Sequence, residues 1–278
     1  MTAPRVSFLM TTLCRPGWDI FLDDLRQQTV SVSQIVVVVD RISEAAERAA
    51  LEATHPDVDF VFNDQNLGVA VSTNRGLSRC DGDVIFRIDD DDACDHERVE
   101  RQLAALEASG ADIAASFGRG VRGEPYKIAA GETISDSWLI RCPQTDAELK
   151  SALLRRNVLI HSSIAIRREA LDRMCGYDES FRYALDYALY LNALKHGMTF
   201  TVVPEPLVTR FYLPGSITIA KRKQQMMFSA AARLLYAAEK DNPGEFIGVM
   251  WRRGWLLAAP NWLRALRRRI FAFLGLGA

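Results

Sequence analysis

Four consecutive aspartates, Asp89 to Asp92, are the residues of this sequence best suited to chemistry. They follow an apolar run at residues 84–88, whose β-branched and aromatic side chains predict a buried strand. Adjacent carboxylates repel one another, so packing them together costs free energy unless a cation compensates their charge. Hard oxygen ligands suit Mg²⁺ or Mn²⁺. We weigh a cation site against a plain solvated acidic turn, and the preceding strand favours the site.

Strands and helices alternate around this acidic run. Strands are expected at 5–12, 34–39, 58–62, 84–88 and 113–117, and helices at 19–28, 44–53, 69–78 and 96–108. This alternation predicts an α/β fold, with a mainly parallel sheet covered by helices on both faces. Ligands of such sheets bind at the carboxyl ends of strands, where Thr11, Asp40 and the acidic run are placed. These residues are expected to share one crevice with the helix N-terminus that follows Gly68.

The second half of the sequence has a looser pattern. Residues 118–137 suggest a hairpin or mobile loops, followed by helices at 146–155, 168–174 and 183–196 and strands at 162–167, 200–203 and 207–211. From residue 221 the pattern is helical, with breaks near Pro243 and Pro260. The expected organisation is therefore a catalytic domain at 1–220 and a helical C-terminal appendage at 221–278.

Composition and charge narrow the class of protein. The chain has 278 residues, of which 49% are hydrophobic and 25% charged, an ordinary globular composition. Beyond Trp251 there are six arginines and no acidic residue, so the remainder carries 28 basic against 35 acidic residues, a net charge of −7. That balance argues against nucleic-acid binding by the bulk of the chain. Five cysteines without paired or zinc-like spacing, and no signal-peptide pattern, lead us to expect a cytoplasmic protein.

The C-terminal segment has a different composition. Its arginines alternate with Trp, Phe and Leu between Trp251 and Leu274, as in amphipathic helices that lie on anionic lipid. No apolar stretch reaches the ~20 residues that a spanning helix needs. We therefore expect peripheral attachment to the inner face of the cell membrane, with packing on protein as the alternative.

The order of the motifs resembles family 2 glycosyltransferases with the GT-A fold. The resemblance covers residues 5–218 approximately. Its first half rests on residues 6–12, 35–40, 66–68, 74–77, 82–86 and the acidic run, and its second half on 161–163, 167–168, 176–181 and 186–191. It implies a nucleotide-sugar half at about 1–117 and an acceptor half at about 118–220. It also implies inverting transfer of a single sugar, most simply from a UDP-sugar, to a glycan or lipid-linked acceptor in cell-surface polysaccharide synthesis.

The resemblance also assigns roles to individual residues. The nucleotide-sugar donor would be bound by Thr11, Asp40, Asn74, Asp89 and Asp90, with Asp90 mainly a spacer. The metal, Mg²⁺ or Mn²⁺, would be held by Asp91 with Asp92 beside it, and Asp186 would be the catalytic base. His161 and Trp138 would lie on the acceptor side, unless they serve only packing.

Some positions depart from the family pattern. Arg41 follows Asp40 where relatives carry a second Asp, and Leu185 replaces the Glu that usually precedes Asp186. No His precedes the Gly215-Ser216 turn. Arg41 and Leu185 favour one alternative, a catalytically degenerate nucleotide- or glycan-binding module. A second alternative, a sugar-phosphate nucleotidyltransferase, needs a phosphate-binding loop that residues 12–17 match poorly.

Overall fold

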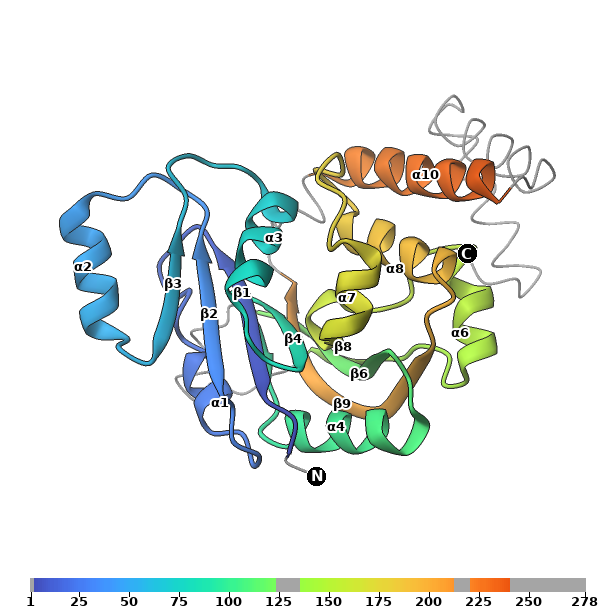
Figure 1. Cartoon of the computed structure of the whole chain (residues 1–278), viewed down its shortest axis with the longest axis horizontal. Helices are drawn as coiled ribbons and strands as arrows, with labels where there is room; N and C mark the ends of the chain where they lie inside the picture. The colour runs from blue at the N-terminus through green and yellow to red at the C-terminus, as the bar shows by residue number, and fades with distance from the viewer. Residues whose placement is uncertain (1–2, 124–135, 213–220, 241–278) are drawn as a thin grey trace.

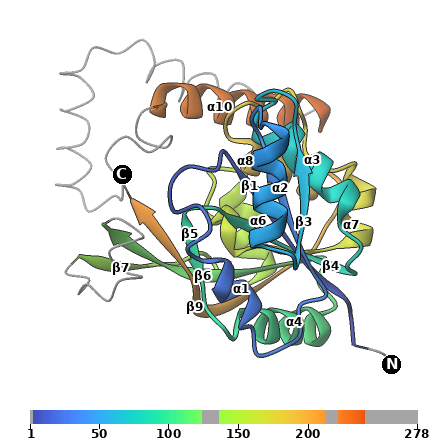
Figure 2. The same ribbon diagram turned by 90° about the vertical axis from the view of Figure 1, so that its left-hand side faces the viewer.

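The computed structural model describes residues 3–123, 136–212 and 221–240. Within them the strands form one mixed sheet of nine, in the order β3-β2-β1-β4-β8-β6-β9-β5, with β7 paired to β6 (Figures 1 and 2). The strands are β1 (Val6–Thr12), β2 (Gln34–Val39), β3 (Val58–Phe62), β4 (Val84–Asp89), β5 (Asp92–Cys94), β6 (Ile113–Arg122), β7 (Ser137–Ile140), β8 (Ala165–Arg167) and β9 (Phe200–Tyr212).

Helices cover both faces of this sheet (Figure 1). They are α1 (Leu22–Arg26), α2 (Ala45–Thr54), α3 (Val69–Arg79), α4 (Arg98–Ser109), α6 (Asp146–Leu153), α7 (Arg168–Met174), α8 (Leu185–Lys195), α10 (Arg222–Glu239) and the 3₁₀ turn η1 (His161–Ser163). The expected α/β fold is thus confirmed.

Two hydrophobic cores follow from the alternation of side chains along the strands. On one face, Leu9 of β1 and Val36 of β2 pack with residues of α3, α7 and α8. On the other face, Phe8 of β1 and Phe86 of β4 pack with residues of α1 and α4. Because β1 to β4 are parallel, their carboxyl ends meet at one edge, and Thr11 of β1 pairs directly with Asp89 of β4.

The acidic run, Asp89 to Asp92, connects two parts of the sheet rather than forming a simple turn after a strand. We call this connection the β4–β5 crossing. Asp89 ends β4 among the parallel strands, whereas Asp92 begins β5, which pairs antiparallel with β9. β9 is one long strand with an irregular register opposite Ser116 and Phe117, so the two strands expected at 200–203 and 207–211 are continuous. The strand expected at 162–167 ends at Arg167 as expected but begins only at Ala165, since η1 occupies the residues before it.

A fully buried arginine of α4 holds the strand that leads into the crossing. Arg98, at the start of α4, is 0% exposed and donates to the backbone oxygens of Arg87 (3.0 Å) and Ile164 (3.1 Å). Its Nε donates to Gln102, and its guanidinium lies 5.4 Å from the centre of the Phe86 ring. One side chain therefore ties α4 to β4 and to the segment after η1.

Replacing Arg98 by Met is expected to lower the free energy of unfolding by about 3 kcal/mol, because buried carbonyl groups lose a charged donor. The measurement is urea unfolding followed by circular dichroism. Arg101→Met, an exposed change on the same helix, serves as the control. Equal stabilities for the two variants would show that Arg98 does not hold this junction.

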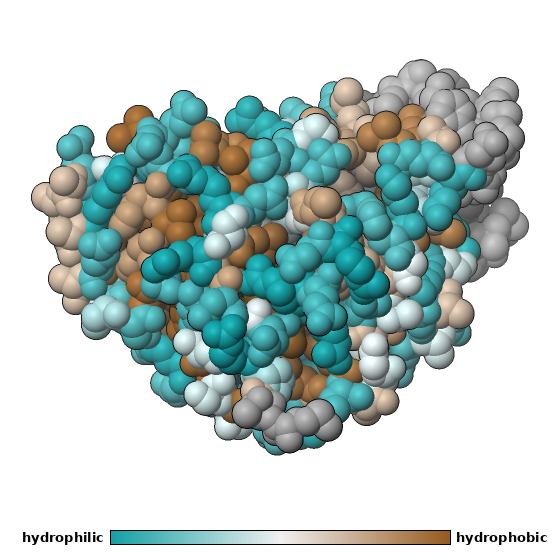
Figure 3. Space-filling view, in the orientation of Figure 1, coloured by the Kyte–Doolittle hydropathy of each residue, from teal (hydrophilic) through white to brown (hydrophobic). Residues whose placement is uncertain are grey.

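The last described helix, α10, packs on α8 through a small cluster that includes Phe181, Tyr187 and Ala232. Its Met227 and Leu235 are exposed. The face of the molecule seen in Figure 3 is mostly hydrophilic, with scattered hydrophobic residues between the polar ones. Among the residues that the structure describes, no helix is both long and apolar enough to cross a bilayer. The arginine-rich segment at 251–278 lies outside the described residues.

Candidate active site

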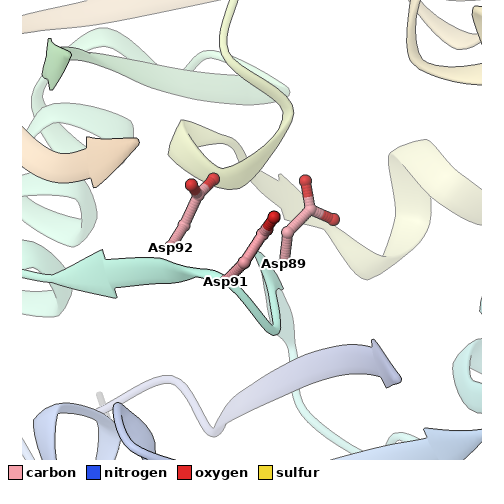
Figure 4. A group of neighbouring side chains, drawn as sticks. All are labelled: Asp89, Asp91 and Asp92. Atoms are coloured by element: carbon pink, nitrogen blue, oxygen red, sulfur yellow. The ribbon is translucent and has the colours of Figure 1, made fainter. Parts of the chain in front are cut away.

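Three of the four consecutive aspartates converge. Asp89, Asp91 and Asp92 each offer a carboxylate oxygen within 4.8 Å of the others. Their side chains leave the same side of the β4–β5 crossing and point toward the segment that carries η1 (Figure 4). Three oxygens at this separation can approach one divalent cation together. The sequence interpretation gave Asp89 to the sugar nucleotide, and the structure brings it into the same cluster as the proposed metal ligands.

Asp89 is held by a buried neighbour on its own strand. Arg87 is 2% exposed and donates to Asp89 (2.7 Å), to the Thr11 hydroxyl (3.0 Å) and to the Leu9 carbonyl (3.2 Å). Burial acts most strongly and would raise the pKa of Asp89, but Arg87, His161, Arg210 and the Ser162 hydrogen bond together lower it below its usual value. Asp89 is therefore ionised at neutral pH. Thr11 is buried beside it and uses its hydroxyl to accept from Arg87.

Asp90 and Asp92 turn to different partners. Asp90 accepts from the Thr12 hydroxyl (2.6 Å) and is not a member of the three-carboxylate cluster. Asp92 is 3% exposed and accepts from the Ser162 hydroxyl of η1 (2.5 Å), which itself accepts from the backbone N–H of Asp89 (3.1 Å). Ser162 thus joins both ends of the acidic crossing to η1.

The electrostatics of the cluster favour a bound cation. Burial first, and then Asp89 and Asp90, raise the pKa of Asp91 to about 6. Burial, and then Asp91 and Asp89, raise the pKa of Asp92 well above its usual value. Both shifts reflect the unfavourable free energy of holding several ionised carboxylates close together with little water. A bound divalent cation would offset this repulsion. The oxygen-only donor set fits Mg²⁺ or Mn²⁺.

The Asp40 side chain is hydrogen-bonded within the protein. Asp40 is 4% exposed, and its carboxylate accepts from the Asn63 amide (2.9 Å) and from the backbone N–H groups of Leu67 (2.7 Å) and Gly68 (2.9 Å). It therefore fixes the turn that leads into α3 at the edge of the sheet. Arg41, which follows it, pairs with Glu47 of α2.

Asn74 links the two halves of the domain. From the middle of α3 it donates to the Tyr177 carbonyl (2.8 Å) and to Glu179 (2.9 Å), and it accepts from the Tyr177 N–H (2.8 Å). Gly176 has a φ of 71°, and a Cβ there would lie 2.7 Å from the Asn74 oxygen, so the turn requires glycine. Both the side-chain oxygen and the side-chain nitrogen of Asn74 are engaged within the protein.

Asp186 is positioned by an asparagine that the sequence interpretation did not include. Asp186 lies in the first turn of α8, as expected, and accepts from the Asn157 amide (2.7 Å) and from the N–H of Tyr187 (2.8 Å). The Asn157 oxygen accepts from the Leu159 N–H (3.1 Å), which fixes the direction of its amide. Asn157 thereby sets the orientation of the Asp186 carboxylate.

If the site has the transfer activity that the resemblance implies, replacing Asn157 by Ala is expected to reduce that activity about tenfold, because Asp186 loses one anchor and misplaced catalytic groups are costly. The affinity for the implied nucleotide, tested with UDP, is expected to stay the same, since Asn157 is not hydrogen-bonded to Asp89, Asp90, Asp91 or Asp92. Steady-state kinetics and UDP titration check the two parts separately. A weaker UDP affinity with unchanged kcat would contradict a role through Asp186.

His161 lies between the acidic cluster and Asp186. Its Nε2 is 2.8 Å from the Tyr177 hydroxyl, and its Nδ1 is 3.9 Å from Asp89. Burial, and then the nearby Arg87, lower the pKa of His161 to about 4, although Asp89 and Asp186 act the other way. The imidazole is therefore neutral at physiological pH and suited to hydrogen bonding.

Trp138 lies at the far end of the β6–β7 pair. It is 36% exposed and packs over Gly120, where a Cβ would meet the indole at 2.3 Å. The Tyr212 ring lies 5.0 Å from it, and the Arg122 guanidinium lies 5.7 Å above it. These contacts cover part of its surface, and about a third of the residue remains exposed.

Arg210 is a further charged residue that the sequence interpretation missed. It stands opposite Asp92 in the β5–β9 pairing. Burial acts to lower its pKa, but Asp92, Tyr212, Asp89 and Asp186 together raise it. The positive charge of Arg210 therefore interacts with both the acidic cluster and Asp186.

Sequence signals for these missed residues differ. Arg87 interrupts an otherwise apolar strand, and a charge inside a buried strand is a readable signal. Ser162 lies in the 161–163 segment that carries the resemblance, but its partners are 70 and 73 positions away and no local pattern indicates them. Asn157 and Arg210 give no signal, because their roles depend on a contact across 29 positions and on strand pairing.

The structure is an α/β sheet covered by helices on both faces, with a carboxylate cluster at the edge where its parallel strands end. The family described as Glycosyl transferase family 2 matches residues 19–175, more than half of the chain. The chain belongs to this family and is a glycosyltransferase.

Relatives agree with this assignment. The amylovoran biosynthesis glycosyltransferase AmsE of Erwinia amylovora is 26% identical over 73% of this chain and 72% of its own. An uncharacterized glycosyltransferase of Haemophilus influenzae is 33% identical over 67% of this chain and 60% of its own. The crystal structure of S. aureus TarS 1–349 in complex with UDP-GlcNAc superposes with a TM-score of 0.65, at 15% identity, over 94% of this chain and 77% of that one. This likeness confirms the GT-A fold.

Proposed function

We propose that this glycosyltransferase transfers one sugar, with inversion, from a UDP-sugar to a glycan or lipid-linked acceptor in cell-surface polysaccharide synthesis. The observation that carries the proposal is the convergence of Asp89, Asp91 and Asp92 within 4.8 Å, on the sheet edge that GT-A enzymes use. Relatives named for amylovoran and succinoglycan biosynthesis support the polysaccharide context. The UDP-GlcNAc complex of TarS supports a uridine nucleotide.

The donor site follows from the roles of the cluster. Asp91 and Asp92 would hold Mg²⁺ or Mn²⁺, and Asp89 would complete the set or contact the donor. The metal would supply electrostatic stabilisation of the departing diphosphate. Thr11, Asp40, Asn74 and Asp90 would shape the nucleotide pocket. In this proposal Asp40 and Asn74 act mainly by fixing backbone segments, since their side chains already bind the protein.

The acceptor site centres on Asp186. As general base it would take the proton of the acceptor hydroxyl while that oxygen attacks the anomeric carbon. Its carboxylate is oriented by the Asn157 amide and the Tyr187 N–H. Neutral His161 would offer a hydrogen bond nearby, and the exposed part of Trp138 would contact a sugar ring.

Incubation with a panel of nucleotide sugars, with and without Mn²⁺, tests the proposal. We expect Mn²⁺-dependent release of UDP from at least one UDP-sugar, and none from GDP- or ADP-sugars. No release from any donor, together with no metal-dependent nucleotide binding, would favour the degenerate module that Arg41 and Leu185 suggest. Nucleotide transfer onto a sugar phosphate would instead show a nucleotidyltransferase.

We also propose a catalytic domain at 1–220 and a C-terminal appendage at 221–278 that attaches to the cytoplasmic face of the membrane. The arginines and aromatic residues beyond Trp251 support the attachment. Sedimentation with anionic vesicles tests it, using the full chain and a chain that ends at residue 259. Equal sedimentation of the two would overturn the proposal.

A further inference from the structure

A small polar pocket lies directly beside the proposed base. Its volume is about 250 Å³, and its lining includes Arg141, Arg156, Asn157, Arg210 and Tyr212. It is smaller than the ~300–1,000 Å³ of typical drug-sized sites. A pocket of this size suits a compact group rather than a whole sugar chain.

The charge of this pocket is one-sided. Three of its nine lining residues are arginines and none is acidic, although the chain before Trp251 has a net charge of −7. Among residues 3–123, 136–212 and 221–240, no acidic side chain pairs with Arg141 or Arg156. Arg141 and Arg156 are exposed, and two guanidinium groups without acidic partners on one hollow create a positive potential that attracts an anion.

Two residues of the pocket lining, Asn157 and Arg210, also contact or neighbour the proposed catalytic aspartates. Asn157 contributes to its lining and also donates to Asp186 at 2.7 Å. Arg210 contributes to its lining and stands opposite Asp92 of the acidic cluster. A group bound in the pocket would therefore be held next to the carboxylate proposed to activate the acceptor.

The rest of the lining is apolar. Ile140, Val158, Leu159 and Ile160 line the pocket together with the arginines. Guanidinium groups bind phosphate through paired hydrogen bonds, and the apolar side chains offer a surface to the carbon atoms that follow the phosphate. The chemistry of the lining matches a phosphate ester.

We propose that this pocket binds a phosphate group of the acceptor and so places a neighbouring acceptor hydroxyl at Asp186. The inference rests on the proposed function, in that it specifies the acceptor as a phosphorylated one. The phosphate can belong to a lipid carrier or to a water-soluble glycan, and both present the same oxygens to Arg141 and Arg156.

Calorimetric titration of the full chain in EDTA tests the pocket without the donor site, because the metal-free aspartates repel phosphate. The probes are octyl phosphate and glycerol 3-phosphate. We expect saturable binding of at least one probe, weakened about tenfold or more in the double variant Arg141→Gln/Arg156→Gln. Tighter binding of octyl phosphate would point to a lipid carrier, and tighter binding of glycerol phosphate to a soluble acceptor.

Arg155→Gln is the matched control, since Arg155 is exposed and adjacent in sequence but lines a different hollow with Pro143 and Glu148. It is expected to bind the probes like the unchanged chain. Equal weakening in Arg155→Gln, unchanged affinity in a correctly folded double variant, or no binding by the unchanged chain would overturn the inference. Mn²⁺-dependent UDP binding, measured on the unchanged chain, reports separately on the proposed function.

Discussion

Replacing Asp186 by Asn is expected to reduce sugar transfer by about 10²–10⁴-fold, the usual contribution of a general base. Asn has nearly the same shape, and its single side-chain oxygen can still accept from the Asn157 amide, at the cost of the hydrogen bond from the Tyr187 N–H. It cannot accept a proton from the acceptor hydroxyl. The affinity for UDP with Mn²⁺ is expected to remain unchanged, because Asp186 is not part of the three-carboxylate cluster.

The measurement is kcat from UDP release, together with calorimetry for UDP. Asp172→Asn, an exposed change on α7, removes the same charge at a distance from the site and is expected to keep full activity. Turnover of Asp186→Asn at the unchanged rate would show that another group takes the proton. Loss of UDP binding would show that Asp186 acts on the donor.

Replacing Asp91 by Asn is expected to have two opposite effects. It removes a proposed metal ligand, so Mn²⁺-dependent UDP binding should weaken by at least tenfold. It also removes a repelling charge, so the metal-free protein should become more stable at neutral pH by about 1 kcal/mol, after allowance for the solvent exposure of Asp91. The same substitution should therefore weaken metal-dependent nucleotide binding and stabilise the metal-free fold.

The stability gain has a defined pH dependence. Burial, Asp89 and Asp90 raise the pKa of Asp91 from 3.8 to about 6, so the folded state holds this proton more tightly than the unfolded state. The ionised carboxylate therefore destabilises the folded protein above about pH 6, and the penalty disappears below about pH 4. The difference in melting temperature between Asp91→Asn and the unchanged chain, measured in EDTA, should be largest at neutral pH and vanish near pH 4.

Glu107→Gln, an exposed change on α4, provides the control for the charge removed. It should show neither the stability gain nor the loss of metal-dependent binding. A destabilised Asp91→Asn protein at neutral pH would mean that Asp91 has a structural role that outweighs the repulsion. Retained Mn²⁺-dependent binding would place the metal elsewhere.

The sequence was most informative where local patterns dominate. The strands at 34–39 and 58–62 and the helix near 69–78 match the structure almost residue for residue, because buried β-branched runs and helical spacing are local signals. The first helix was expected at 19–28 and is only Leu22–Arg26 in the structure. Thr11 was expected to lie near the acidic run, because the carboxyl ends of neighbouring parallel strands lie at the same edge of a sheet. The pairing of Thr11 with Asp89 agrees with this expectation.

Tertiary pairing accounts for most of what the sequence did not reveal. β5 is only three residues long and is a strand because β9 lies beside it. Ser162 and Asn157 position aspartates that are 70 and 29 residues away, and no spacing rule reaches that far. The internal contacts of Asp40 and Asn74 also depend on turns whose positions only the folded chain fixes.

Calorimetric titration of the full chain with UDP, in Mn²⁺ and in EDTA, tests the central claim most directly. The account predicts saturable binding in Mn²⁺, at least tenfold weaker binding in EDTA, and loss of the difference in Asp91→Asn. UDP binding that is equal in Mn²⁺ and EDTA, or a full metal effect in Asp91→Asn, would contradict the assignment of the acidic crossing as the metal and donor site.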